Sequence, residues 1–176
     1  MFTEYALTKL NKTRQLFAGK LKNIDAMIDA REALLLKYCT LLDPIVEGTE
    51  QECPPRDKIA DFCQTLVDYA SRGHFDIYPR ILQIMETISG KRLSLAQKII
   101  PKINANLDEI IKFDDRYGED ATGENIDFAT FKEDLGKIGQ VLETRFTLED
   151  RLVIVLQMLD DVMQVQTTSE RKGSKK

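Results

Sequence analysis

Apolar residues recur along this chain at steps of three and four, which places them on one face of an α-helix. The pattern predicts helices over residues 4–17, 21–42, 57–71, 77–89, 93–113 and 127–165. No segment has the alternation expected of a convincing strand. We therefore expect an all-α fold, with a four-helix-bundle core, short additional helices and a long C-terminal helix.

Prolines interrupt two of these stripes. Asp43 and Pro44 should end the second helix, and residues 44–56 should form a loop, because that segment also holds the Pro54-Pro55 pair. Pro101 falls inside the fifth predicted helix, so we expect either a kink there or a later start of the helix.

The stretch SRGHFDIYPR, residues 71–80, contains the only histidine of the sequence, His74. Gly73 suits the left-handed position that closes a helix. Asp76 can then cap the next helix, and Pro79 fits its first turn, where a missing N–H costs nothing. This succession of residues that end one helix and start another predicts a corner between two helices.

The last predicted helix places charged residues where its own pattern requires a core. Arg145 and Glu149 fall in its apolar stripe one turn apart, so they can pair. Buried charges have to be paired, because their desolvation costs several kcal/mol. We expect a polar core layer that fixes helix register; a binding cavity or a catalytic site is the alternative. The candidate members are Tyr69, Arg145, Glu149 and Asp150, with Tyr78 and His74 as further partners.

Asp61, Gln64 and Asp68 form one row on the predicted helix 57–71, on the side away from its apolar stripe. Such a row is usually a solvated face. The alternative is an acidic docking surface for a basic partner.

Charge is distributed unevenly along the chain. The formal net charge is −4, but residues 1–22 and the last six residues carry +4 each, which leaves −12 on residues 23–170. An acidic body repels nucleic acid and attracts basic partners, so we expect no direct contact with nucleic acid. The alternative interpretation of the charge is that the acidic faces only keep the protein soluble.

Neither a membrane span nor a secretory signal is apparent, and we expect a soluble, cytoplasmic protein. The three cysteines Cys39, Cys53 and Cys63 form no CxxC motif. With a single histidine they provide neither a disulfide framework nor an evident zinc site.

No phosphate-binding loop or nucleophile elbow is present, so we expect a protein that is not an enzyme and needs no cofactor. Histidine phosphotransfer bundles carry a histidine in the middle of a helix, followed three residues later by lysine. Here Ile77 follows His74 at that distance. A phosphotransfer domain using His74 therefore remains only the alternative interpretation.

Three segments carry a family resemblance: DFCQTLVDYASRGHFDIYPRIL (residues 61–82), KIIPKINAN (98–106) and LETRFTLEDRLVIVL (142–156). In sequence, order and spacing they resemble the Rsd/AlgQ family (regulator of sigma D), anti-sigma factors that act on the primary sigma factor. The resemblance covers most of residues 20–160.

The resemblance implies a helical anti-sigma domain, which we place at residues 1–166, and we expect the polar, basic residues 167–176 to form a disordered tail. It implies binding to the C-terminal, −35-recognising domain of the primary sigma factor, as a monomer in a one-to-one complex, with effects in stationary phase. Some family members also bind the phosphocarrier HPr. Within the first segment, the hypothetical sigma-binding residues are Asp61, Gln64, Asp68, His74, Phe75 and Tyr78.

Overall fold

The computed structural model contains helices and no strand among the residues that it describes, which confirms the predicted all-α fold class. The described backbone covers residues 2–17, 19, 22–49, 52–87, 91–121 and 126–173, and side chains are described within 7–17, 19, 24–49, 52–87, 93–121 and 126–156. The helices are α1 (Phe2–Phe17), α2 (Lys22–Val46), α3 (Arg56–Arg72), α4 (Tyr78–Glu86), α5 (Lys91–Asn104), α6 (Leu107–Tyr117) and α7 (Phe128–Gly173). A π-helical turn, η1 (Gly73–Ile77), joins α3 to α4.

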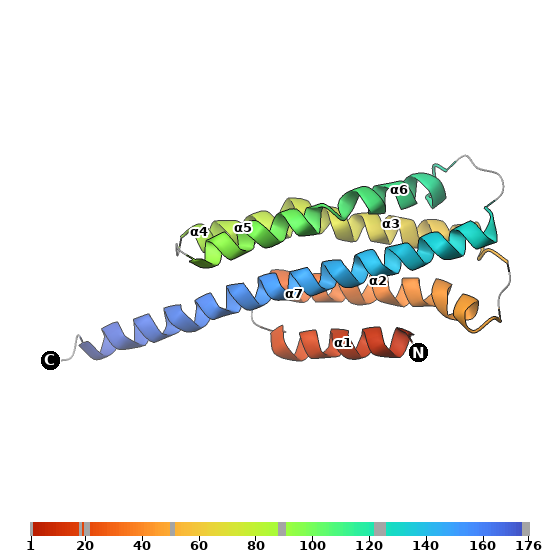
Figure 1. Cartoon of the computed structure of the whole chain (residues 1–176). Coiled ribbons are helices and arrows are strands. Elements are labelled where there is room, and N and C mark those ends of the chain that lie inside the picture. The colour runs from red at the N-terminus through yellow and green to blue at the C-terminus, as the bar shows by residue number, and fades with distance from the viewer. Residues whose placement is uncertain are drawn as a thin grey trace.

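Four rods form the bundle (Figure 1). One rod is α2, the second is α3 with η1 and α4, the third is α5 with α6, and the fourth is α7. The third rod packs on α7 through α5 and on α3 through α6, while α2 packs on α3 and α7. Helix α1 packs on the outer side of α2, and α7 extends past the bundle towards the C-terminus.

The apolar stripes of these helices form one continuous core. In α7, the predicted core positions with described side chains are all buried: Leu135, Ile138, Leu142, Arg145, Glu149, Leu152 and Leu156. Leu159 and Met163, the last two predicted positions, lie outside the described side chains. The stripe therefore identified the buried face of α7, including its two charged members.

Pro44 does not end α2, contrary to the prediction, because the helix continues to Val46 with Pro44 inside its last turn. A proline near a helix end removes only one backbone hydrogen bond, and the extra turn buries Ile45 in the core. The chain leaves the helix at Gly48, whose φ of 71° is the left-handed conformation that glycine adopts readily.

The predicted corner at residues 71–80 is wrong. The helix continues from α3 into α4, and the N–H of Tyr78 bonds to the carbonyl of Gly73, five residues earlier. Gly73 has φ −56° and ψ −52°, ordinary right-handed values, so it is no left-handed cap. Asp76 lies within η1 and makes no cap hydrogen bond, whereas Pro79 does occupy the first turn of α4.

Gly73 is required for space. A methyl group at this position would lie 2.6 Å from the Tyr78 hydroxyl oxygen and 3.0 Å from an Arg145 guanidinium nitrogen. The backbone of η1 therefore rests directly on polar side chains of the core.

The long predicted helix 93–113 consists of two helices. α5 runs through Pro101 to Asn104, and the break falls at Ala105 and Asn106. Asp108 and Glu109 occupy the first turn of α6, where carboxylates interact favourably with the helix dipole. The expected interruption thus exists, a few residues after the proline.

Helix α7 begins as predicted and extends further. Asp127 accepts hydrogen bonds from the backbone N–H and the hydroxyl of Thr130, which fixes the first turn and lowers the pKa of Asp127. The helix ends at Gly173, beyond the predicted end at Val165. The segment predicted as a tail therefore begins within α7, and residues 174–176 fall outside the described residues.

Candidate functional site

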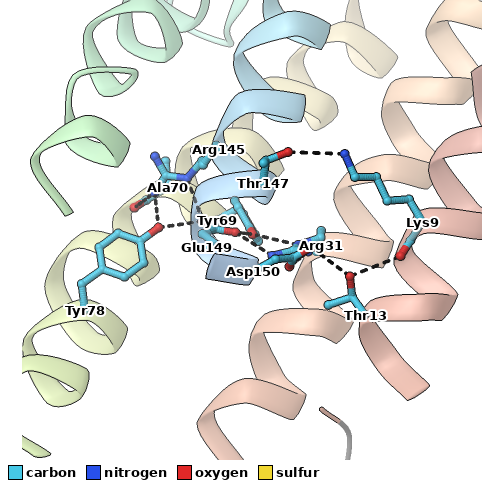
Figure 2. A network of polar contacts seen from close by, with 10 residues as sticks. All are labelled: Lys9, Thr13, Arg31, Tyr69, Ala70, Tyr78, Arg145, Thr147, Glu149 and Asp150. Atoms are coloured by element: carbon cyan, nitrogen blue, oxygen red, sulfur yellow. Dashed lines mark hydrogen bonds and ion pairs between the residues drawn. The ribbon is translucent and has the colours of Figure 1, made fainter. Parts of the chain in front are cut away.

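A buried ionic network lies between α2, α3, α4 and α7, with the Glu149 carboxylate at its centre (Figure 2). Oxygen Oε1 accepts from the Tyr78 hydroxyl at 2.6 Å and from Arg145 Nε at 3.1 Å. Oxygen Oε2 accepts from Arg31 Nη2 at 2.9 Å and from the Tyr69 hydroxyl. A carboxylate offers about four acceptor positions, so Glu149 is fully satisfied although only 1% of it is exposed.

Arg31 connects this centre to α2. Its Nη1 donates to Asp150 Oδ1 at 2.7 Å, and its guanidinium lies 4.6 Å from the centre of the Phe146 ring. Asp150 in turn accepts from the Thr13 hydroxyl of α1 at 3.0 Å. The network therefore reaches from the core to the outer helix α1.

Arg145 connects the centre to the π-helical turn. Its Nη2 donates to the Tyr78 hydroxyl at 2.9 Å and to the carbonyl of Ala70 at 3.2 Å. That carbonyl belongs to the last turns of α3, next to Gly73. Arg145 thus holds α7, the end of α3 and the start of α4 together.

The network has two guanidinium groups and two carboxylates, so its formal charge is zero. Burial alone lowers the pKa of Arg31, but the carboxylates of Glu149 and Asp150 more than compensate and raise it overall. Burial, together with the charge of Glu149, raises the pKa of Tyr69 and of Tyr78 above the usual value. The two phenols therefore stay neutral donors at any physiological pH.

A cavity of about 40 Å³ adjoins the network between α1, α2 and α7, with Leu35, Leu142 and Phe146 in its wall. Small-molecule sites in proteins measure roughly 300–1,000 Å³, so this cavity is far too small for a substrate. The geometry favours a polar core layer over a catalytic pocket.

Sequence reasoning brought together Arg145, Glu149, Tyr69 and Asp150, and the structure places all four in this network. It missed Arg31, which is only 2% exposed. A signal was present, because Arg31 fills the gap between Ile28 and Leu35 in the stripe of α2. His74, the other candidate partner of the polar layer, lies outside this network, next to Asn104 of α5.

The acidic row predicted on residues 57–71 is exposed on α3. Asp61 pairs with Lys37 of α2 at 2.7 Å. Asp68 accepts a hydrogen bond from Gln64 at 2.9 Å, and among the described side chains it forms no ion pair. Asp68 is therefore the carboxylate of this row whose charge is least compensated.

The other three hypothetical surface residues differ in exposure. Phe75 is 73% exposed on η1. His74 is half-buried, with Nδ1 3.0 Å from Asn104 Oδ1 of α5 and its ring perpendicular to the ring of Phe75 at 4.7 Å between centres. Tyr78 is 2% exposed and bonds to Glu149, so it belongs to the ionic network and not to a docking face.

The cysteines have environments expected of structural thiols. Cys39 and Cys63 are buried and Cys53 is half-buried. Burial raises the pKa of Cys63 to about 12, which leaves the thiol protonated and inert.

Neither a metal centre nor a membrane span is evident in the part of the chain that the structure describes. No cluster of three or more histidine, cysteine, aspartate or glutamate residues there could hold a metal ion. None of the described helices combines the length and the hydropathy needed to cross a bilayer.

Comparison with known proteins gives a consistent result. The family model described as regulator of RNA polymerase sigma(70) subunit, Rsd/AlgQ, matches residues 6–157. The regulator of sigma D from Yersinia enterocolitica is 36% identical over 151 residues, which cover 84% of this chain and 87% of that protein. The regulators of sigma D from Shigella dysenteriae and Escherichia coli O139:H28 are 37% and 36% identical, and each comparison covers 85% of this chain and 93% of the relative. A match of this extent shows that the chain belongs to the Rsd/AlgQ family of regulators of the RNA polymerase sigma(70) subunit.

Proposed function

We propose that this protein is an anti-sigma factor that binds the C-terminal, −35-recognising domain of the primary sigma factor. Binding would reduce the association of sigma with core RNA polymerase and promoter DNA, in stationary phase, through a one-to-one complex. Family membership supports the general role. The observation that carries the specific surface is the exposed row on α3 and η1.

That row consists of Asp61, Gln64 and Asp68, and it continues through Arg72 to the exposed ring of Phe75. A helix-turn-helix domain that reads promoter DNA presents a basic surface to the phosphates. A carboxylate without an ion-pair partner can take the place of a phosphate there, and Asp68 forms no ion pair among the described side chains. The exposed aromatic ring of Phe75, about two turns further along the rod, can anchor the contact, because binding energy concentrates in such residues.

The acidic body should speed the encounter with a basic domain. Residues 23–170 carry a net charge of −12, and complementary charges raise association rates, most strongly at low salt. The affinity should therefore fall as the ionic strength rises.

The direct test is titration of the sigma C-terminal domain against the double variant Asp61→Lys/Asp68→Lys. Reversing two contact charges should cost at least about 1 kcal/mol, roughly a fivefold loss of affinity. The matched control is Asp108→Lys/Asp115→Lys, two exposed aspartates with the same sequence spacing on α6. Both variants have the same net charge, so equal affinities for the two at low salt would contradict the docking surface.

A functional assay separates sequestration from catalysis. Transcription from a promoter of the primary sigma factor should fall in proportion to the amount of this protein added, and stop when it equals the amount of sigma. Phosphate incorporation at His74 would instead support the phosphotransfer alternative. HPr, titrated in the same way as the sigma domain, tests whether this chain has the second partner known from some family members.

A further inference from the structure

The outward face of α5 is basic, on a protein whose body is acidic. Lys98 and Lys102 lie one turn apart on this face, and Leu95, three residues before Lys98, is 48% exposed. Between Glu86 and Asp108 the sequence contains four basic residues and no acidic one. This segment contrasts with the net charge of −12 on residues 23–170.

The core fixes the direction of this face. Ala96, Ile100 and Ile103 are buried, and α5 packs on α4 and α7. Because residues three and four apart share a helix face, Leu95, Lys98 and Lys102 form one row on the opposite side. Rotation of α5 would expose the buried residues, so the row has to face solvent.

The charges of this row are uncompensated. Within the described side chains, neither Lys98 nor Lys102 forms an ion pair. Lysines of other helices do so, as Lys37 pairs with Asp61 and Lys112 with Glu109. No acidic residue occurs in α5, so no neighbour on the same helix can neutralise the row.

We propose that the α5 row, defined as Leu95, Lys98 and Lys102, is a docking site for an acidic amphipathic helix of a protein partner. It is separate from the acidic row on α3 and does not depend on sigma binding. Two positive charges and an exposed leucine match carboxylates combined with an apolar side chain. A nucleic acid fits less well, because the acidic body repels a polyanion and phosphates offer nothing for Leu95 to contact.

The spacing of the row defines the matching sequence. An antiparallel partner helix needs two glutamates four residues apart to meet Lys102 and Lys98. It needs a large apolar residue three positions further on, which packs on Leu95. The sequence Glu-x-x-x-Glu-x-x-Leu satisfies both conditions.

The test uses a fluorescent helical peptide that carries this motif, a second peptide with both glutamates replaced by glutamine, and a labelled duplex DNA. Binding of each to the full chain is followed by anisotropy at low and at physiological salt. The acidic peptide should bind in a salt-dependent way, and Lys98→Glu/Lys102→Glu should weaken it about tenfold. Leu95→Ala should weaken it by a smaller factor at all salt concentrations, because it removes an apolar contact.

The matched control is Lys58→Glu/Lys132→Glu, two exposed lysines on α3 and α7 with no ion pair among the described side chains. It changes the net charge equally and should retain binding of the acidic peptide. The proposal is overturned if the acidic peptide does not bind, if the glutamine peptide binds equally well, or if both double variants lose affinity alike. It is also overturned if the duplex DNA binds more tightly than the peptide and loses affinity through Lys98→Glu/Lys102→Glu. Sigma affinity should be unchanged in that variant, which distinguishes failure of this site from failure of the proposed function.

Discussion

Arg31 of α2 and Glu149 of α7 are 118 residues apart in the sequence, and their side chains meet at 2.9 Å between Nη2 and Oε2. Each side chain is only 2% exposed. A helix packed in another register would bury at least one of these charges without its partner, at a cost of several kcal/mol. The pair therefore selects which faces of α2 and α7 come together.

Removing the central carboxylate should destabilise the fold strongly. Glu149→Gln leaves Arg31 and Arg145 without their shared counter-charge, and breaking a buried pair in this way costs about 3–5 kcal/mol. The urea midpoint of unfolding, followed by circular dichroism, measures the loss. Glu133→Gln, which removes only the surface pair with Lys137, should change stability by less than about 0.5 kcal/mol. Similar losses for both variants would contradict the central role of Glu149.

Two glycine-to-alanine substitutions should have opposite effects. At Gly73 the new methyl group would meet the Tyr78 hydroxyl and Arg145, so we expect destabilisation by about 1–3 kcal/mol. At Gly136 in α7 the methyl group would enter open space, and alanine should stabilise the helix by up to about 1 kcal/mol. Thermal unfolding of the two variants measures both changes in stability. An unchanged stability of Gly73→Ala would show that η1 can move away from the network.

Alkaline pH should unfold the protein through its tyrosines. Burial raises the pKa of Tyr38, Tyr69 and Tyr78, and it raises that of Tyr117 to about 12, above the unfolded value of about 10. The neutral phenols thus contribute stability that is complete below pH of about 10 and is lost as pH rises above it. Tyrosinate absorbance and helical circular dichroism should therefore change together. If these tyrosines ionise at a pH of about 10 while the helices remain intact, the prediction is contradicted.

Phe75 should be important for binding and unimportant for folding. Its ring is 73% exposed, so Phe75→Ala should change the free energy of unfolding by less than about 0.5 kcal/mol. If the ring anchors the sigma domain, affinity should fall by about 2 kcal/mol, the range of interface hot spots. Ile111→Ala, at a side chain that is 45% exposed on α6, is the control. Equal affinities for the two variants would remove Phe75 from the docking face.

Within the acidic row, the two aspartates should not be equivalent. Asp61 is engaged by Lys37 at 2.7 Å, whereas Asp68 contacts only the neutral amide of Gln64 among the described side chains. Asp68→Asn should therefore weaken sigma binding more than Asp61→Asn, by a margin that shrinks as salt increases. The titration described above, repeated with each single variant, measures the difference.

Helical periodicity predicted most of the fold, because burial of one face determines where a helix lies. It also predicted that Arg145 and Glu149 are buried, since both fall in the stripe of α7. Arg31 was not predicted to be buried, because a single charged residue in an apolar stripe indicates burial only when a partner of opposite charge is known. Its partners, Glu149 and Asp150, come from the other end of the sequence.

The error at residues 71–80 has a different cause. Glycine, aspartate and proline in close succession usually mark the end of one helix and the start of another. Here Gly73 is needed for contact with Tyr78 and Arg145, which only tertiary packing reveals. Gly139 of α7 is another glycine that packing requires, because the Tyr38 hydroxyl occupies the space where a side chain would be.

The π-helical turn between α3 and α4 also changes the phase of the rod. The π-helical turn η1 contains about one residue more than an α-helical turn. Every later side chain is therefore rotated by about 100° relative to an uninterrupted α-helix. The stripe of α3 that ends at Tyr69 and Ala70 is thereby offset from the stripe of Tyr78, Ile81 and Met85 in α4. One rod can in this way face α2 and α6 along its first half and α5 along its second. Deleting a single residue from η1 would remove the offset and turn Tyr78 out of the core. Packing of the core therefore determines the length of η1 as strictly as its amino-acid composition.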